Sequence, residues 1–210
     1  MSPARGHLIA FEGTEGTGKS TQLRLAAAAL RRAGYTVCET REPGGTPIGT
    51  EIRRVVMHFE GDTPTPLTEL LLYLADRSQH LEQVIRPALA AGHVVLTDRF
   101  SASTIAYQGY GRGLDLATVT QLDALARGEV TPDLTVLLDC PIEVGLRRAY
   151  GDDRFHRADR AFHERVRRGF HELAAQQSDR FRLLDVTRPA ALVAEEVLAA
   201  VTACVTHGSH

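Results

Sequence analysis

The chain of 210 residues has no asparagine and no tryptophan, and Lys19 is its only lysine among 24 basic residues. Every other basic position is therefore an arginine, whose planar guanidinium does not replace a compact ammonium in a tight loop. GTPases that recognise guanine use an Asn-Lys-x-Asp motif. Because the chain has no asparagine and no second lysine, this class is excluded.

Long hydrophobic runs and an excess of one charge are also absent. No window holds the 18 or so apolar residues of a membrane span, and 24 basic residues against 26 acidic ones give a net charge of −2. Neither a membrane nor a nucleic acid is expected as a partner. The N-terminal residues run directly into a predicted strand, so we expect a cytoplasmic protein.

Cysteines are few and odd in number, and neither they nor the nine histidines show metal-ligand spacing. The cysteines are expected to be buried thiols rather than a disulfide framework. Some histidines are expected to face solvent. The residues concerned are Cys38, Cys140 and Cys204, and His156, His163 and His171.

A phosphate-binding loop follows the first predicted strand. Residues 13–20 read Gly-Thr-Glu-Gly-Thr-Gly-Lys-Ser, between the apolar run 8–11 and the helix-forming stretch 21–30. Glycines let successive backbone N–H groups point into one concavity, and the following helix adds its positive end. Lys19 is expected to reach the β- and γ-phosphates of ATP, and Ser20 to ligate Mg²⁺. The predicted ATP-binding residues are Gly13, Thr14, Glu15, Gly16, Thr17, Gly18, Lys19, Ser20 and Thr21.

Strands and helices alternate along the chain, which predicts an α/β domain spanning residues 1–210, with a parallel sheet and helices on both faces. Glycines at 109, 111 and 113 lack the context of a dinucleotide fingerprint, so 108–113 is read as a turn. Predicted strands cover 8–11, 35–38, 93–97, 134–139 and 181–185. Predicted helices follow the phosphate-binding loop and Arg99, and cover about 51–58, 67–91 and 190–205.

Two arginines favour a kinase among the proteins with such a loop. The third strand ends in Asp98-Arg99, whereas motor ATPases usually end this strand in an acidic pair. Arg41 and Arg99 suggest a second phosphate-bearing substrate opposite the first, and hence a nucleoside-monophosphate kinase. The alternatives are a kinase for another monophosphate or a deoxynucleoside, and an ATP-dependent binding or switch module. The last leaves Arg41, Tyr73 and Arg77 unexplained.

Several separated motifs then narrow the interpretation. They are Phe11-Glu12-Gly13 with the loop that follows, and the segments 41–46, 73–80, 98–100, 107–109 and 132–135. Together they closely resemble the thymidylate kinases from about residue 7 to 205. The resemblance implies the three-layer P-loop nucleoside-monophosphate kinase fold with about five parallel strands. It also implies a homodimer and the reaction of ATP and dTMP, with Mg²⁺, to ADP and dTDP.

The resemblance also implies roles for single residues. Glu15 would approach the sugar 3′-hydroxyl, Arg41 and Arg99 would bind the acceptor phosphate, and Asp98 would lie near Mg²⁺. Tyr73 would stack on thymine, and Arg77 would read the base edge. The implied dTMP-binding residues are Glu15, Arg41, Pro43, Tyr73, Arg77, Arg99, Ser103, Thr104, Tyr107 and Gln108. A cis peptide is implied at Glu42-Pro43.

A mobile lid at about 147–160 is expected to supply a catalytic arginine. Gly16 stands where another branch of the family has arginine, so the chain resembles the bacterial type with a lid-supplied arginine. Arg154 is the predicted catalytic residue of the lid. The other predicted catalytic residues are Lys19, Arg99 and Glu15. Because His156 stands where the family usually has glutamate, Arg147 and Arg148 remain alternatives.

Overall fold

Five parallel strands form one sheet in the computed structural model, which describes residues 5–58, 63–149 and 159–207. The order across the sheet is β2-β3-β1-β4-β5. Because the strands are parallel, the carboxyl ends of β1, β2 and β3 lie at one edge. The bounds are β1 His7–Glu12, β2 Val37–Arg41, β3 Val94–Asp98, β4 Leu134–Asp139 and β5 Phe181–Asp185.

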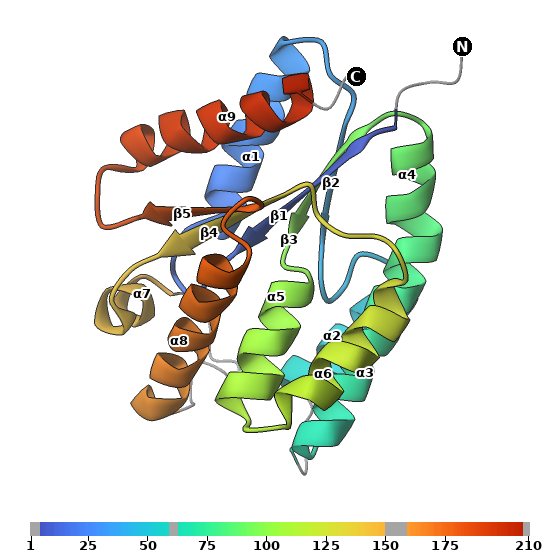
Figure 1. Cartoon of the computed structure of the whole chain (residues 1–210), viewed down its shortest axis with the longest axis vertical. Helices are drawn as coiled ribbons and strands as arrows, with labels where there is room; N and C mark the ends of the chain where they lie inside the picture. Colours follow the sequence, from blue (N-terminus) through green and yellow to red (C-terminus); the bar gives the residue numbers. More distant parts are fainter. Residues whose placement is uncertain (1–4, 59–62, 150–158, 208–210) are drawn as a thin grey trace.

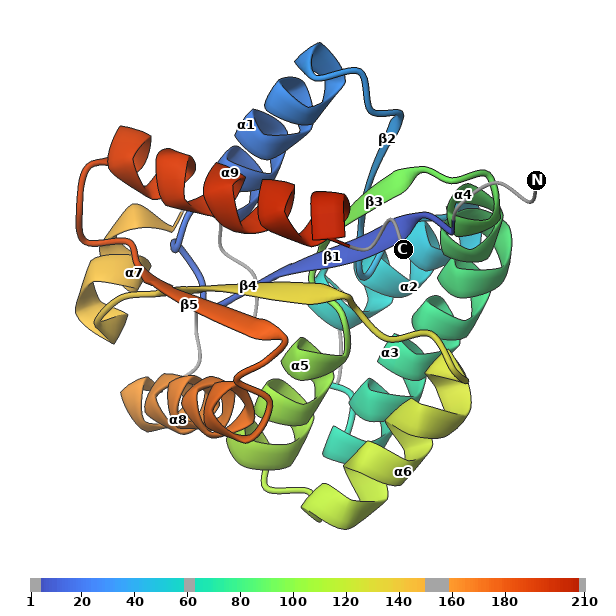
Figure 2. The ribbon, with the colours of Figure 1, turned by 45° about the horizontal axis from the view of Figure 1, so that its top comes forward.

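Helices cover both faces of the sheet, as Figures 1 and 2 show, with α1 and α9 together on one face and α3, α5, α6 and α8 beyond the other. The bounds are α1 Lys19–Arg32, α2 Pro47–His58, α3 Pro66–His80, η1 Leu81–Ile85, α4 Arg86–Ala90, α5 Ser101–Thr104, η2 Ile105–Gly111, α6 Leu116–Arg127, α7 Ile142–Arg148, α8 Arg160–Gln176 and α9 Ala190–His207. Here η denotes π-helical segments. The predicted three-layer fold is confirmed.

The alternation of side chains along β1 divides the core in two. Ile9 and Phe11 pack in the cluster under α1 and α9, whereas Leu8 and Ala10 pack with η1 and α4 on the opposite face. All four side chains are at most 1% exposed. A strand buried on both faces reads as a continuous apolar run, which is why the sequence predicts it well.

The second strand differs from its predicted bounds of 35–38. It begins at Val37 and continues to Arg41, opposite Asp98 of β3. β2 is an edge strand, so its outer residues are polar, and Glu39 pairs with Arg31 of α1. An apolar run therefore marks only the start of this strand.

Helix bounds differ where glycine or proline was given too much weight. Helix α2 begins at Pro47, and the Thr46 hydroxyl accepts from the N–H of Gly49 at 2.9 Å. The stretch 67–91 is interrupted by the π-helical η1. The predicted turn at 108–113 is wrong, because η2 extends through most of it. A Cβ on Gly111 would lie 2.7 Å from the ring of Phe162, so this glycine permits close helix packing.

Helices α6, α7 and α8 were not predicted. The largest, α8, begins after Asp159, whose side chain accepts a hydrogen bond from the N–H of Phe162.

Cys140 is buried, Cys38 and Cys204 are half-buried, and all three are free thiols. Within the described ranges, no helix is long and apolar enough to cross a bilayer. A cytoplasmic location stays a prediction.

Candidate active site

The loop between β1 and α1 has the backbone of a phosphate cradle. Gly13, Gly16 and Gly18 have φ of 139°, 69° and 84°, a region that residues with a Cβ rarely adopt. Helix α1 begins at Lys19, so its free N–H groups face the hollow above the loop. Thr17 closes the loop internally by donating to the carbonyl of Thr14 at 2.9 Å.

Lys19 is held at this loop by backbone carbonyls. Its Nζ donates to the carbonyls of Gly13 at 3.1 Å and Thr14 at 2.8 Å. Burial, together with the positive charge of Arg99, lowers the pKa of Lys19 to about 8. An ammonium that is costly to bury alone gains from an anion placed beside it, so the site favours a bound oligophosphate.

Gly16 touches the backbone of α7. A Cβ on Gly16 would lie 1.9 Å from the carbonyl oxygen of Gly145, and a Cβ on Gly145 would lie 2.5 Å from the carbonyl of Glu15. No side chain fits at position 16 in this arrangement. An arginine at position 16 is therefore sterically excluded, and the source of the catalytic arginine stays a prediction.

Arg99 connects the loop to the first turns after β3. Its φ is 75°, an unusual value for an arginine, and its N–H donates to the carbonyl of Phe11 at 3.0 Å. Its guanidinium donates to the carbonyl of Gly13 at 3.0 Å, the hydroxyl of Ser103 at 2.9 Å and the hydroxyl of Tyr107 at 3.2 Å. The cation therefore stands between the loop and the residues predicted to bind the acceptor.

Glu15 is buried but ionised. Although burial opposes ionisation, contact with His163 and the charges of Arg99 and Lys19 hold its pKa well below the usual range. Oε1 accepts from the Tyr107 hydroxyl at 2.6 Å. Nδ1 of His163 lies 3.4 Å from Oε2, in a geometry that makes no hydrogen bond. The prediction that His163 faces solvent is wrong: it is fully buried, because α8 packs against η2.

A cavity of about 390 Å³ opens beside Glu15 and Arg99. All the residues predicted to bind dTMP line it, except Arg41. Glu42, Met57 and Phe100 also line it and were not predicted. The mixture of aromatic surface with a few placed polar groups is typical of sites for small organic ligands.

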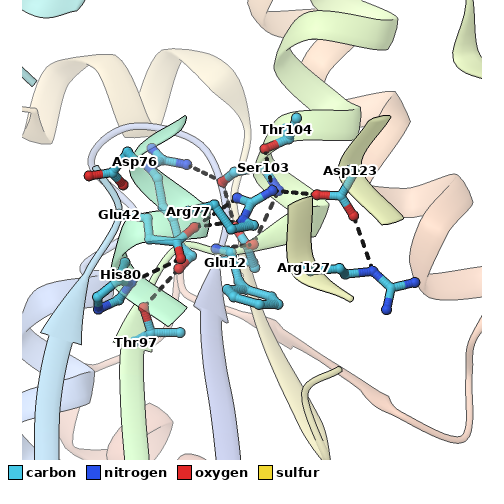
Figure 3. Close-up of polar contacts among 12 residues, drawn as sticks. Glu12, Glu42, Asp76, Arg77, His80, Thr97, Ser103, Thr104, Asp123 and Arg127 are labelled. Atoms are coloured by element: carbon cyan, nitrogen blue, oxygen red, sulfur yellow. Dashed lines mark hydrogen bonds and ion pairs between the residues drawn. The ribbon is translucent and has the colours of Figure 1, made fainter. Parts of the chain in front are cut away.

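The floor of this cavity is a buried ionic network, drawn in Figure 3. Arg77 is 2% exposed and donates to Glu42 Oε2 at 2.9 Å and to the Thr104 hydroxyl at 2.9 Å, and it also pairs with Asp123. Although burial alone would lower it, the carboxylates of Glu42 and Asp123 raise the pKa of Arg77 above its usual value. His80 Nδ1 lies 2.9 Å from Glu42 Oε1. The network fixes the segment 41–46 to α3.

A second hollow of about 1040 Å³ lies over the phosphate-binding loop. Arg41, Arg53 and Arg148 line it with Lys19 and Arg99, as do Glu15, Gly16, Gly18, Ser20, Thr21 and Asp98. Burial and the neighbouring Arg41 lower the pKa of Arg53. Several cations converge on this space, which suits a ligand with several negative charges. The structure thus places Arg41 beside the loop.

Ser20 and Asp98 meet at the edge of this hollow. The Ser20 hydroxyl donates to Asp98 Oδ2 at 2.6 Å. Among the described residues, no group of three or more His, Cys, Asp or Glu side chains could hold a metal ion. One hydroxyl and one carboxylate fit Mg²⁺, which usually takes its other ligands from phosphates and water.

The lid prediction falls largely outside the described residues, and Arg154 and His156 both lie there. Its described start shows Arg147 donating to the carbonyl of Glu143 at 3.1 Å. Arg148 donates to the carbonyl of Val186 at 2.8 Å and lines the hollow over the loop.

Sequence reasoning missed the residues that support the site from below. Glu12 accepts from the N–H groups of Phe100 and Ser103 and from the Ser103 hydroxyl, and so holds the start of α5. In the sequence, the only indication of this role is that Glu12 directly precedes Gly13. Glu42 stands between the predicted Arg41 and Pro43, which is a usable signal. Asp123 has none, because it is 46 positions from its partner Arg77. The predicted cis peptide at Glu42-Pro43 is confirmed.

Comparisons with known proteins agree with this geometry. The family model for thymidylate kinase matches residues 11–197. A thymidylate kinase of Geobacter sulfurreducens is 50% identical over 189 residues, covering 86% of this chain and 89% of the relative. One from a Synechococcus strain is 54% identical over 172 residues, covering 82% of each. The crystal structure of the Ehrlichia chaffeensis thymidylate kinase superposes with a TM-score of 0.79 at 34% identity, covering 94% and 99% of the two chains.

The match spans both hollows and every strand except the start of β1. It includes residues 13–20, Arg99 and all the residues that line the cavity. It is therefore more specific than a match to a phosphate-binding loop alone. The chain belongs to the thymidylate kinase family, and its reaction is the phosphorylation of dTMP to dTDP.

Proposed function

We propose that the hollow over residues 13–20 holds ATP, and that the 390 Å³ cavity holds dTMP with its phosphate turned toward Arg99. The observation that carries this assignment is the position of Arg99, which contacts both the Gly13 carbonyl and the cavity residues Ser103 and Tyr107. Both hollows share Glu15 and Arg99, so the two phosphates would meet at this guanidinium.

Phosphoryl transfer requires in-line placement of two phosphates and cations that balance the charge of the transition state. Lys19 would release the carbonyls of Gly13 and Thr14 and bind the donor phosphates. Arg41 would bind the acceptor phosphate together with Arg99. Glu15 would accept from the sugar 3′-hydroxyl, since this residue lines the cavity.

Ser20 and Asp98 would hold Mg²⁺, since they already lie 2.6 Å apart at the edge of the donor hollow. The ion would supply positive charge to balance the phosphates during transfer. A lid arginine, for which Arg154 remains our candidate, would complete the cations. Water must be excluded from the site, because it would otherwise accept the phosphoryl group.

Incubation of the protein with ATP, Mg²⁺ and dTMP tests the assignment. We expect ADP and dTDP in equal amounts, and no reaction after addition of a chelator. ADP formed at the same rate without dTMP would show that water is the acceptor and would contradict a closed kinase site.

We further propose a homodimer, formed through the outer surface of α3 and α6. Leu67 and Leu71 are each 50% exposed on α3, and Leu125 is 81% exposed on α6. The two helices lie side by side in Figures 1 and 2 and pack through Leu70, Leu74 and Val119. Large exposed leucines on two neighbouring helices favour a protein interface.

Light scattering tests this assembly. Leu71→Glu combined with Leu125→Glu should halve the mass, because charges would be buried in the interface. Leu183→Glu on β5 is the matched control, since Leu183 is 47% exposed but lies on another element. A monomeric wild-type chain would contradict the proposal.

A further inference from the structure

Glu69 of α3 is a fully buried carboxylate that does not itself line the cavity but bonds to a residue that does. Its Oε1 accepts from the side-chain amide of Gln108 at 2.7 Å. Arg112 donates to Oε1 at 3.2 Å and to Oε2 at 3.1 Å, so the charge of Glu69 is balanced. Gln108 itself is 1% exposed and lines the cavity.

A carboxylate held by an arginine accepts hydrogen bonds and donates none. The end of the Gln108 amide that faces Glu69 must therefore be the NH₂ group, and the carbonyl Oε1 stands at the other end. Turning the amide would place two acceptor oxygens against each other in a buried site. The charge of Glu69 thus orients the Gln108 side-chain amide, so that its carbonyl oxygen is the end that can accept a hydrogen bond from a ligand.

The neighbouring Thr104 has the opposite polarity, for a related reason. Its hydroxyl accepts from Arg77 Nη1 at 2.9 Å, so its own hydrogen remains to be donated (Figure 3). Thr104 and Gln108 are four residues apart on continuous helical backbone, and both line the cavity. Two charged side chains of α3, Arg77 and Glu69, therefore set one donor and one acceptor at the cavity wall.

We propose that Glu69 is a specificity-determining positioning residue, which holds the Gln108 carbonyl oxygen toward the base of the acceptor nucleotide. A base with an imide N–H beside a carbonyl, such as thymine or uracil, matches an acceptor next to a donor. Cytosine presents a ring nitrogen that accepts, so two acceptors would meet. The inference rests on the proposed function, because it takes the cavity as the site of the acceptor base.

The test compares dTMP, dUMP and dCMP as acceptors for the wild-type chain and for Glu69→Gln. Glutamine at 69 can donate as well as accept, so Gln108 would no longer have one fixed orientation. We expect the ratio of kcat/KM for dUMP over dCMP to fall by about tenfold or more, since one misplaced hydrogen-bonding group is worth at least this. The ratio of dTMP over dUMP reports only the methyl group and should change less than about twofold.

Glu82→Gln is the matched control, because Glu82 pairs with Arg86 at the exposed surface and should leave both ratios unchanged. If Glu69→Gln slows all three substrates by one common factor, Glu69 is structural only and the proposal is wrong. A wild-type chain that phosphorylates none of the three would instead contradict the proposed function.

A double variant keeps the test decisive if Glu69→Gln does not fold. In Glu69→Gln with Gln108→Glu, the carboxylate moves to position 108, and Arg112 still has a negative partner nearby. Position 108 then presents only acceptor oxygens, so the dUMP over dCMP preference should return to within about threefold of the wild type. A folded double variant without this preference would overturn the proposal.

Discussion

The hydroxyl of Tyr107 donates a 2.6 Å hydrogen bond to Oε1 of Glu15, although the two residues are 92 positions apart. Arg99 lies 3.4 Å from the same oxygen, so one side of the carboxylate is occupied. Among the described residues, none donates to Oε2. The phosphate-binding loop is therefore tied to the acceptor cavity by the Glu15 side chain, whose Oε2 lies 3.4 Å from Nδ1 of the buried His163.

Tyr107→Phe should raise KM for dTMP about tenfold with a smaller change in kcat, because a hydrogen bond to a charged group of about 1.4 kcal/mol is lost. Tyr110→Phe is the matched control, since its hydroxyl donates to Glu172 at 2.7 Å on the surface. Steady-state kinetics compares the two. Equal effects of both changes would mean that the Glu15 contact has no part in acceptor binding.

Lys19→Ala should lower kcat at least about 10²-fold, because it removes the cation that balances the transferred phosphate. Calorimetry should show dTMP affinity within about threefold of wild type, since the cavity does not include Lys19. Lys19→Arg should fail as well, because a guanidinium does not fit between the carbonyls of Gly13 and Thr14. Loss of dTMP affinity as severe as the loss of turnover would refute this separation of roles.

Asp76 predicts a specific dependence of stability on pH. Its Oδ1 accepts from the N–H of Gly44 at 3.0 Å, and burial together with the Glu42 carboxylate raises the pKa of Asp76 to about 6. Because this pKa is above the unfolded value of about 4, the stabilising effect of the proton is complete below about pH 4. It is lost as pH rises through 6.

Asp76→Asn removes this titration while an oxygen still faces Gly44. Relative to wild type, its free energy of unfolding should rise by about 2 kcal/mol between pH 4.5 and 7.5. Urea unfolding at a series of pH values measures the difference. Parallel curves for the two proteins would show that Asp76 has an ordinary pKa in the folded state.

Three alanine variants assign the lid arginine. Arg154→Ala should lower kcat and kcat/KM together by at least roughly 10²-fold, as expected for a residue that acts mainly on the transition state. Arg147→Ala should be close to wild type, because its side chain bonds a carbonyl of its own helix. If Arg148→Ala loses most of its kcat and Arg154→Ala does not, the catalytic role belongs to Arg148, which lines the hollow over the loop.

Strands β4 and β5 and the phosphate-binding loop were predicted with their correct bounds. β4 is a continuous apolar run, and the loop requires glycines that few other structures use together. β2 was misplaced because an edge strand needs polar residues on its outer side. Gly109 and Gly111 were misread as a turn, because a glycine that allows close packing looks the same in sequence as one that allows a bend.

The lining of the cavity was predicted through the family resemblance, but its support was not. Asp123 and Glu69 contact site residues 46 and 39 positions away, and nothing local marks such partners. His163 was assigned to the surface because the histidines show no metal-ligand spacing, whereas the packing of α8 on η2 buries it beside Glu15. Long-range packing decides both cases.

This chain phosphorylates dTMP, and we place the acceptor in the cavity lined by Tyr73 and Gln108. A coupled assay of ADP release across dTMP, dUMP, dCMP, AMP and GMP, at fixed ATP and Mg²⁺, tests this assignment. We expect the highest kcat/KM for dTMP, with dUMP next and the other three lower by at least about tenfold. A higher kcat/KM for AMP, GMP or dCMP than for dTMP would contradict it.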